Sequence, residues 1–238
     1  PLSRHYRDEL VKWSKICKTI QVWDYSANHS HFLAPLPNMH TFGPDMRFYA
    51  EHNVKGVFMQ VIPRITGGER AAMRAWVLAK LFWSPDLNVR ELELDYIWGT
   101  WGVVAPLMAE YTALLHAQAD DRPLDPTTGS GHQGCRFAMD APFLTRAFVD
   151  EATRIFDAAE AAAESENIRR RVERARLPIL YVKLMRGPDF TGDSYGALID
   201  RFEYTARRVV FHDFPVAGLF DLTISTLCSD DEVFSAIG

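Results

Sequence analysis

Two short apolar runs near the start of the chain have the length and composition of buried β-strands. Residues 20–25 read I-Q-V-W-D-Y and residues 54–61 read V-K-G-V-F-M-Q-V, and both are rich in β-branched and aromatic side chains. Apolar residues at helical spacing over 6–16 predict a helix before the first run. Pro44 begins a second helical pattern, which Asn53 can end in a left-handed conformation. This alternation of helices and strands predicts a parallel sheet.

Beyond Thr66 the spacing of apolar residues changes to that of helices. The pattern predicts a helix over 71–81 that is apolar on most of its circumference, and a second helix capped by Asp86 or Asn88 and broken by Gly99 and Gly102. Further helices are predicted over 103–116, 142–164, 166–186 with an interruption at Pro178, and 195–208. Residues 118–140 have the composition of a long loop, and the pattern over 209–227 predicts no particular element.

Polar and aromatic residues gather where the two predicted strands end. Asp24 and Tyr25 close the first strand, Asn28 and His31 follow in its loop, and Gln60 closes the second strand. The carboxyl ends of neighbouring parallel strands lie at one edge of a sheet, where barrel enzymes carry their sites. We therefore expect these side chains to form one site. In a regular strand, Trp23 and Tyr25 face away from Asp24, so one face is core and the other is site.

Simpler interpretations of these residues remain open. Asp24 can accept hydrogen bonds from loop N–H groups, as Asp often does at turns, and Trp23 can be plain packing. Gln60 can point into a site or be satisfied within the barrel wall. His29 and His31 form an H-x-H pair, but a zinc site needs three or four ligands and none of the remaining Cys or His residues completes the set. The sequence therefore predicts no metal and no cofactor.

Composition is that of an ordinary soluble enzyme or part of one, with 47% hydrophobic residues, 24% charged residues and a net charge of −5. Five arginines lie close together, at positions 169, 170, 171, 174 and 176. Glutamates are interspersed with them, which favours ion pairs on a helix face over a nucleic-acid surface. The sequence has no apolar stretch of membrane-spanning length. Cys17, Cys135 and Cys228 are too few and too far apart to form a disulfide framework.

Three segments also carry a family resemblance. They read W-D-Y-S-A-N-H-S-H-F-L-A-P-L-P-N, F-G-P-D-M-R-F-Y-A-E-H-N-V-K-G-V-F-M-Q and R-A-W-V-L-A-K-L-F-W-S-P-D-L. Together they resemble bacterial domain of unknown function 4838, part of which is classed as glycoside hydrolase family 163. The resemblance runs from about residue 6 to 115 and continues more weakly to R-L-P-I-L-Y-V-K-L at 176–184. It implies retaining endo-acting N-acetylglucosaminidase activity on a TIM-type barrel.

One departure from the family pattern concerns catalysis. The family segment matching residues 57–60 commonly reads V-F-E-Q, whereas this chain has Met59 at the acidic position. Retaining glycosidases need two carboxyl groups about 5 to 5.5 Å apart, and a thioether replaces neither. The chemistry is therefore impaired, or a carboxylate on another strand supplies it. His31 matches a family histidine and is expected to donate to a sugar or to anchor the loop.

Together these observations predict an α/β fold, namely the partial C-terminal portion of a (β/α)8 TIM-type barrel followed by a mainly α-helical domain. Two strands cannot form a stable sheet, so further strands are expected before Pro1 in a longer protein. The predicted parts of the chain are the last two strand units of the barrel at 1–66, helices that pack on the barrel at 67–117, a loop or linker at 118–141 and a helical domain at 142–238. The resemblance implies an exported protein.

The expected partner is a glycan containing N-acetylglucosamine, which the protein hydrolyses or recognises. Asp24 is the expected catalytic residue. The expected binding residues are Trp23, Tyr25, Asn28, His31 and Gln60. The alternatives are a carbohydrate-binding protein without catalysis, which Met59 favours, and a structural helical module that docks on a barrel. The sequence does not indicate an oligomeric state.

Overall fold

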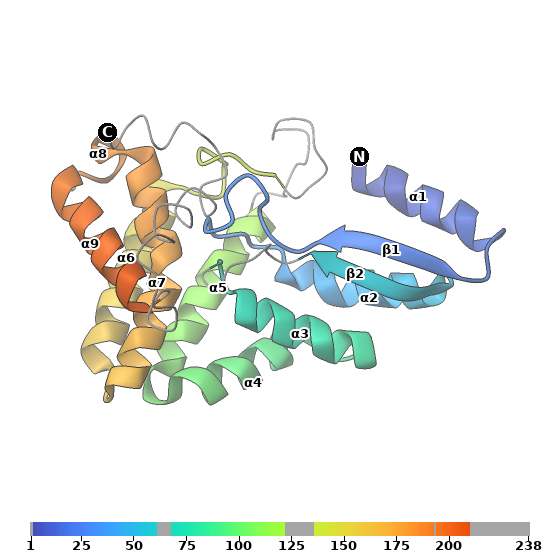
Figure 1. Ribbon diagram of the computed structural model, residues 1–238, viewed down its shortest axis with the longest axis horizontal. Coiled ribbons are helices and arrows are strands. Elements are labelled where there is room, and N and C mark those ends of the chain that lie inside the picture. The colour runs from blue at the N-terminus through green and yellow to red at the C-terminus, as the bar shows by residue number, and fades with distance from the viewer. Residues whose placement is uncertain (1, 61–67, 122–135, 193, 210–238) are drawn as a thin grey trace.

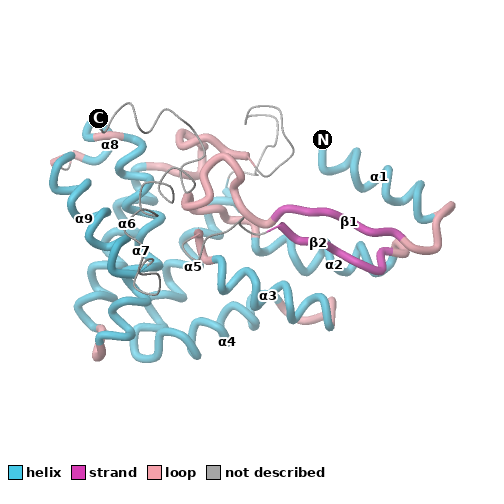
Figure 2. Tube along the Cα trace, in the orientation of Figure 1, coloured by secondary structure: helices cyan, strands magenta, loops and turns pink. Residues whose placement is uncertain are grey.

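A computed structural model describes residues 2–60, 68–121, 136–192 and 194–209 of the chain. Figure 1 shows a small sheet with helices α1 and α2 at one end of the molecule and a group of helices from α4 to α9 at the other. Figure 2 shows the same path, with strands confined to one end and helices over most of the rest. The protein thus combines helices with parallel strands, as the sequence predicts.

The sheet is a strand, helix, strand unit. Strand β1 (Ile20–Tyr25) leads through η1 (Met39–Thr41) into helix α2 (Phe42–Glu51), and the chain returns in strand β2 (Val54–Gln60). The two strands pair in parallel, with Tyr25 opposite Gln60. Both predicted strands are therefore present and adjacent, and Val61 lies outside the described residues. Among those residues, each strand has one unpaired edge.

Asn53 fixes the corner between helix and strand. It lies just beyond α2 with a φ angle of 61°, the left-handed conformation that the sequence predicts. Its side-chain amide donates to the carbonyl oxygens of Ser14 at 2.8 Å and Cys17 at 3.2 Å. Because Ser14 ends helix α1 (Leu2–Ser14), this one side chain joins the turn before β1 to the turn before β2.

Helices α3 (Ala71–Trp83), α4 (Val89–Trp101) and α5 (Ala105–Asp121) follow the sheet. Asn88 caps α4, because its side-chain oxygen accepts from the N–H groups of Arg90 at 2.9 Å and Glu91 at 3.3 Å. Gly102, with a φ angle of 53°, ends α4 and begins η2 (Gly102–Val104), whereas Gly99 lies inside the helix. Most of the predicted loop at 118–141 lies outside the described residues, and α5 extends into its first part.

The second half contains α6 (Arg146–Ala162), α7 (Glu166–Arg186), α8 (Pro188–Thr191) and α9 (Tyr195–Val209). The expected interruption at Pro178 is wrong, since α7 continues through this proline. Proline removes one helical hydrogen bond. Its neighbours Leu177 and Ile179 are buried, and α7 packs against both α6 and α9, so packing holds the helix together. The segment 210–227 lies outside the described residues.

One hydrophobic core joins the loop after β1 to the helices. Leu33, Leu36 and Met39 from this part of the chain belong to the same cluster as Val77 of α3 and Phe202 of α9. The loop is therefore not a free surface segment. Its apolar residues tie the end of the sheet to the helical part of the molecule.

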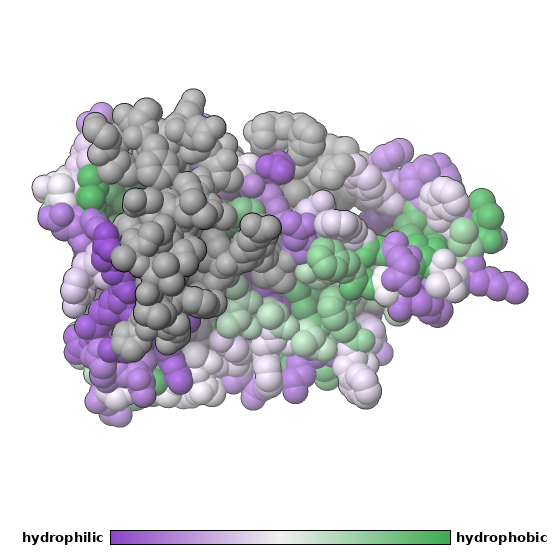
Figure 3. All heavy atoms as spheres, viewed as in Figure 1, coloured by the Kyte–Doolittle hydropathy of each residue, from purple (hydrophilic) through white to green (hydrophobic). Residues whose placement is uncertain are grey.

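Helix α3 is buried on one face and exposed on the other. Met73, Val77 and Leu81 face the core, but Trp83 is 93% exposed and Phe82 is 47% exposed. The outer face also carries exposed alanines, at positions 72, 75 and 79. Figure 3 shows hydrophobic surface over the strands and α3. The apolar pattern was correctly identified, but none of the described segments covers its outer half.

The arginine-rich part of α7 forms ion pairs, as the interspersed glutamates predict. Arg170 pairs with Glu166 at 3.1 Å, one helical turn away. Arg176 is 2% exposed and pairs with Asp157 of α6 at 2.6 Å, so it joins two helices and does not face solvent. Arg170 and Arg176 thus pair with carboxylates of the fold itself.

Candidate functional site

The carboxyl ends of β1 and β2 lie side by side. Tyr25 is the register partner of Gln60, and the N–H of Ser26 donates to the Gln60 carbonyl oxygen at 3.1 Å. The pairing therefore continues one residue beyond β1 and holds the following loop against β2. The structure brings these two predicted site residues together.

One face of the sheet is open to solvent and carries an aromatic pair. Trp23 is 64% exposed and Phe58 is 58% exposed, and their rings meet edge to face with centroids 4.8 Å apart. The indole N–H of Trp23 donates to the side-chain oxygen of Gln60 at 3.0 Å. We call Trp23, Phe58, Tyr25 and Gln60 the open-face group. It presents two apolar rings with an amide and a phenol at the strand ends.

Gly56 lets a further polar side chain lie on this face. A Cβ added at Gly56 would come within 2.0 Å of the side-chain oxygen of Gln21, its register partner. Glycine at this position leaves room for the Gln21 amide over the neighbouring strand, and a larger residue would make the Gln21 side chain move. The open face therefore has amides at both ends of its aromatic pair.

Asp24 lies on the other face of the sheet. One of its carboxylate oxygens accepts from the Tyr49 hydroxyl of α2 at 2.7 Å, and the other accepts from the Tyr25 N–H at 2.7 Å. Met59, its register partner, packs against the hydrophobic core. Strand alternation thus separates the expected catalytic residue from the open-face group.

A second carboxylate approaches Asp24 from α2. Burial and the negative charge of Asp24 raise the pKa of Asp45 to about 6, against the opposing effects of Thr41 and Arg7. Burial and Asp24 also raise the pKa of Tyr49 above its ordinary value, so the phenol keeps its proton and donates to Asp24. Arg7 of α1 contacts Asp45 at 3.3 Å and lies over the Phe48 ring. This cluster joins α1, β1 and α2.

Asn28 and His31 anchor the loop after β1. The Asn28 amide donates to the Phe137 carbonyl at 2.8 Å and its oxygen accepts from the Phe137 N–H at 3.0 Å, which copies a strand pairing. His31 Nδ1 lies 2.9 Å from the Tyr181 hydroxyl of α7. Both side chains are buried and reach segments more than 100 residues away. Of the two roles left open for His31, the geometry shows the anchoring contact.

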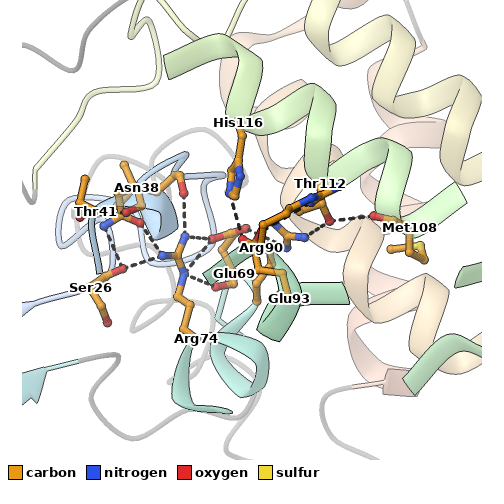
Figure 4. Close-up of polar contacts among 12 residues, drawn as sticks. Ser26, Asn38, Thr41, Glu69, Arg74, Arg90, Glu93, Met108, Thr112 and His116 are labelled. Carbon is orange, nitrogen blue, oxygen red and sulfur yellow. Dashed lines mark hydrogen bonds and ion pairs between the residues drawn. The ribbon is translucent and has the colours of Figure 1, made fainter. Parts of the chain in front are cut away.

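Sequence reasoning missed Arg74, the centre of the scaffold behind this loop. Its side chain is fully buried and donates to the carbonyl oxygens of Ser26 at 2.9 Å and Leu36 at 2.7 Å. It also donates to the side chains of Asn38 and Glu69 (Figure 4). The available signal was a single arginine on the otherwise apolar inner face of the helix at 71–83. A buried charge needs such partners, so Arg74 fixes both ends of the loop.

A second buried charged group lies beside Arg74. Glu93 of α4 and His116 of α5 point toward each other in Figure 4, with His116 Nε2 and Glu93 Oε1 3.3 Å apart but not aligned as a hydrogen bond. Burial raises the pKa of Glu93, and Arg70 and Arg90 oppose that shift. Burial lowers the pKa of His116 to about 3, helped by the positive charge of Arg70. His116 is therefore neutral near pH 7.

These features define a strand, helix, strand unit with one open face. The loop that follows β1 is held by hydrogen bonds from the buried Arg74. Residues 1–113 match the model of the family described as domain of unknown function (DUF4838). The match includes both strands, α3, α4 and the first part of α5. No curated protein and no solved structure gave a match.

The described residues contain no group of three or more His, Cys, Asp or Glu side chains placed to hold a metal ion. None of the helices in the described ranges combines the length and the apolar character needed to cross a membrane.

Proposed function

We propose that this protein recognises carbohydrate, specifically glycans containing N-acetylglucosamine, at the open-face group. The observation that carries the proposal is the hydrogen bond from Trp23 to Gln60 beside the exposed Phe58 ring. Exposed aromatic rings next to polar groups suit a ligand with apolar C–H faces and hydroxyl or amide edges. The indole is held by Gln60, so the ring is oriented before a ligand arrives, which lowers the entropy cost of binding.

The surfaces of the sheet support its placement in a larger (β/α)8 barrel. The two strands have a solvent-exposed face and unpaired edges among the described residues, and α3 has an apolar outer face. Parallel sheets normally have both faces covered. In a barrel, α2 would belong to the outer ring and the open-face group would point inward at the C-terminal mouth, where barrel enzymes carry their sites.

Recognition is favoured over hydrolysis by the direction of the side chains. Retaining hydrolysis needs two carboxyl groups flanking the scissile bond. Asp24 and Met59 both lie on the face that α2 covers, and the open-face group contains no carboxylate. Hydrolysis, the second candidate, would need carboxylates from other strands of such a barrel. In that case Trp23 and Gln60 would hold the sugar, and Asp24 would act only through Tyr25 and Tyr49.

Calorimetry with chitobiose, the disaccharide of N-acetylglucosamine, tests the proposal. Trp23→Ala removes the exposed indole and should weaken binding at least tenfold, which corresponds to about 1.4 kcal/mol. Trp83→Ala is the matched control, because Trp83 is even more exposed but lies at the end of α3. Equal binding by the two variants, or an absence of heat with the unaltered chain, would reject the proposal.

A further inference from the structure

His29 lies at the same strand ends as the open-face group. Its ring meets the Tyr25 ring edge to face with centroids 4.8 Å apart, and the Phe32 ring at 5.1 Å on another side. The residue is 7% exposed. The two aromatic neighbours fix the plane of the imidazole beside Tyr25. The histidine is thus next to the proposed ligand site without being a surface residue.

The two ring nitrogens of His29 have different surroundings. One nitrogen forms a hydrogen bond with the backbone of Gln60, and this bond raises the pKa of the ring. A bond that favours the protonated ring is one in which a ring N–H donates, so the acceptor is the Gln60 carbonyl oxygen. Nε2 has no hydrogen-bond partner and is buried. The donor to Gln60 is therefore Nδ1–H, and the neutral ring keeps a bare lone pair on Nε2.

The surroundings keep this ring neutral. Burial lowers the pKa of His29, and the positive charge of Arg136 lowers it further, against the opposing effect of Gln60. Arg136 also donates to the His29 carbonyl oxygen at 3.4 Å. At neutral pH the imidazole is thus a hydrogen-bond acceptor with its tautomer set by the end of β2.

We propose that His29 is a further binding residue of this site, whose Nε2 accepts a hydrogen bond from a hydroxyl or acetamido N–H of the bound sugar. The inference rests on the proposed function and adds a specific acceptor to it. A buried polar atom without a hydrogen-bond partner is rare in a folded protein, and a functional role is one of its recognised explanations. His31 differs, because its Nδ1 already contacts Tyr181.

Two substitutions separate the roles of the nitrogens. Asn places an N–H near the position of Nδ1, so His29→Asn keeps the bond to Gln60 and removes the acceptor. Gln places an amide near the position of Nε2, so His29→Gln keeps an acceptor and loses the bond to Gln60. We expect His29→Asn to weaken chitobiose binding about tenfold, the usual effect of one hydrogen bond, and His29→Gln to weaken it less.

Nitrogen-15 spectra of the unaltered chain give an independent measurement. We expect a protonated Nδ1 and a bare Nε2 at pH 7, with the Nε2 resonance moving when chitobiose is added. A protonated Nε2, a charged ring at pH 7, or full binding by a folded His29→Asn variant would overturn the inference about His29 and leave the proposed function standing. If the unaltered chain does not bind chitobiose, the proposed function fails and the glycan role of His29 fails with it.

Discussion

Asp24 and Met59 are register partners on the face of the sheet that α2 covers, so neither side chain points toward the exposed Trp23 ring. This relationship bears on the acidic residue that the family pattern has at position 59. Restoring it in this chain would place a carboxylate beside Asp24 and the core, away from the open face. The direction of the side chain, and not only its chemistry, therefore decides what the substitution can do.

We expect Met59→Glu to create no glycosidase activity and to destabilise the fold. Inserting an unpaired carboxylate against the hydrophobic core costs about 1–3 kcal/mol. Phe58→Glu, one residue earlier on the exposed face, is the control and should cost less. Urea unfolding gives the stability, and release of N-acetylglucosamine from chitobiose gives the activity. Sugar release by Met59→Glu would show that position 59 reaches the ligand.

Asp45 should make stability depend on pH. Its folded pKa of about 6 is above its ordinary value of 3.8, so the unfolded chain loses the proton first as pH rises. The stabilisation from the protonated form is complete below pH 3.8 and is lost as pH rises through 6. Asp45→Asn, which stays neutral, should therefore gain stability relative to the unaltered chain between pH 4 and pH 7.5.

The size of that gain is about 1 kcal/mol, because a third of the Asp45 side chain is exposed and solvent screens its charge. Urea unfolding at both pH values measures it. Asp150→Asn, at an exposed ion pair of α6, is the matched control and should show no such difference. An Asp45→Asn variant with the same relative stability at pH 4 and pH 7.5 would contradict the expected shift.

Local signals in the sequence predicted the elements well. The β-branched runs predicted both strands, Asn53 predicted the left-handed corner, and Asn88 was one of the two residues predicted to cap α4. Each depends on residues a few positions apart. Strand alternation also predicted that Trp23 and Asp24 would face opposite sides. Pro178 shows the limit of local rules, because tertiary packing continues a helix that its sequence disfavours.

The candidate site was harder to predict because its contacts are distant in the sequence. Asn28 and His31 read as ligand-binding groups in a loop, yet their partners are Phe137 and Tyr181. The sequence does not indicate which polar group is satisfied inside the protein. Arg74 was missed for the same reason, since its role depends on two loop carbonyl groups that lie 48 and 38 residues away in the sequence.

Arg74 should be essential for the fold of the loop after β1. Arg74→Met keeps the length of the side chain but removes the buried ion pair with Glu69 and the hydrogen bonds to two loop carbonyl groups, which should cost about 3–5 kcal/mol. Arg170→Met removes an exposed ion pair of α7 and should have little effect. Urea unfolding compares the two. Similar stabilities would show that the buried contacts of Arg74 are replaceable.

His116 should contribute to acid unfolding. Its folded pKa of about 3 is below its ordinary value of 6.5, so the unfolded chain takes up the proton first as pH falls. Above pH 6.5 this histidine is neutral in both the folded and the unfolded chain, so it does not reduce the stability of the fold. Stability declines between pH 6.5 and pH 3, by up to about 1.4 kcal/mol per pH unit.

The decline arises because burial disfavours a charged imidazole, and because the positive charges of Arg70, His40 and Arg74 oppose it further. His116→Gln cannot take up the proton. The stability of this variant relative to the unaltered chain should therefore increase from pH 7 to pH 5. His5→Gln, at an exposed position of α1, controls for the general effect of losing a histidine. If His116→Gln and His5→Gln lose stability in parallel with the unaltered chain, acid unfolding starts elsewhere. The Glu93 contact would then hold His116 without setting its protonation.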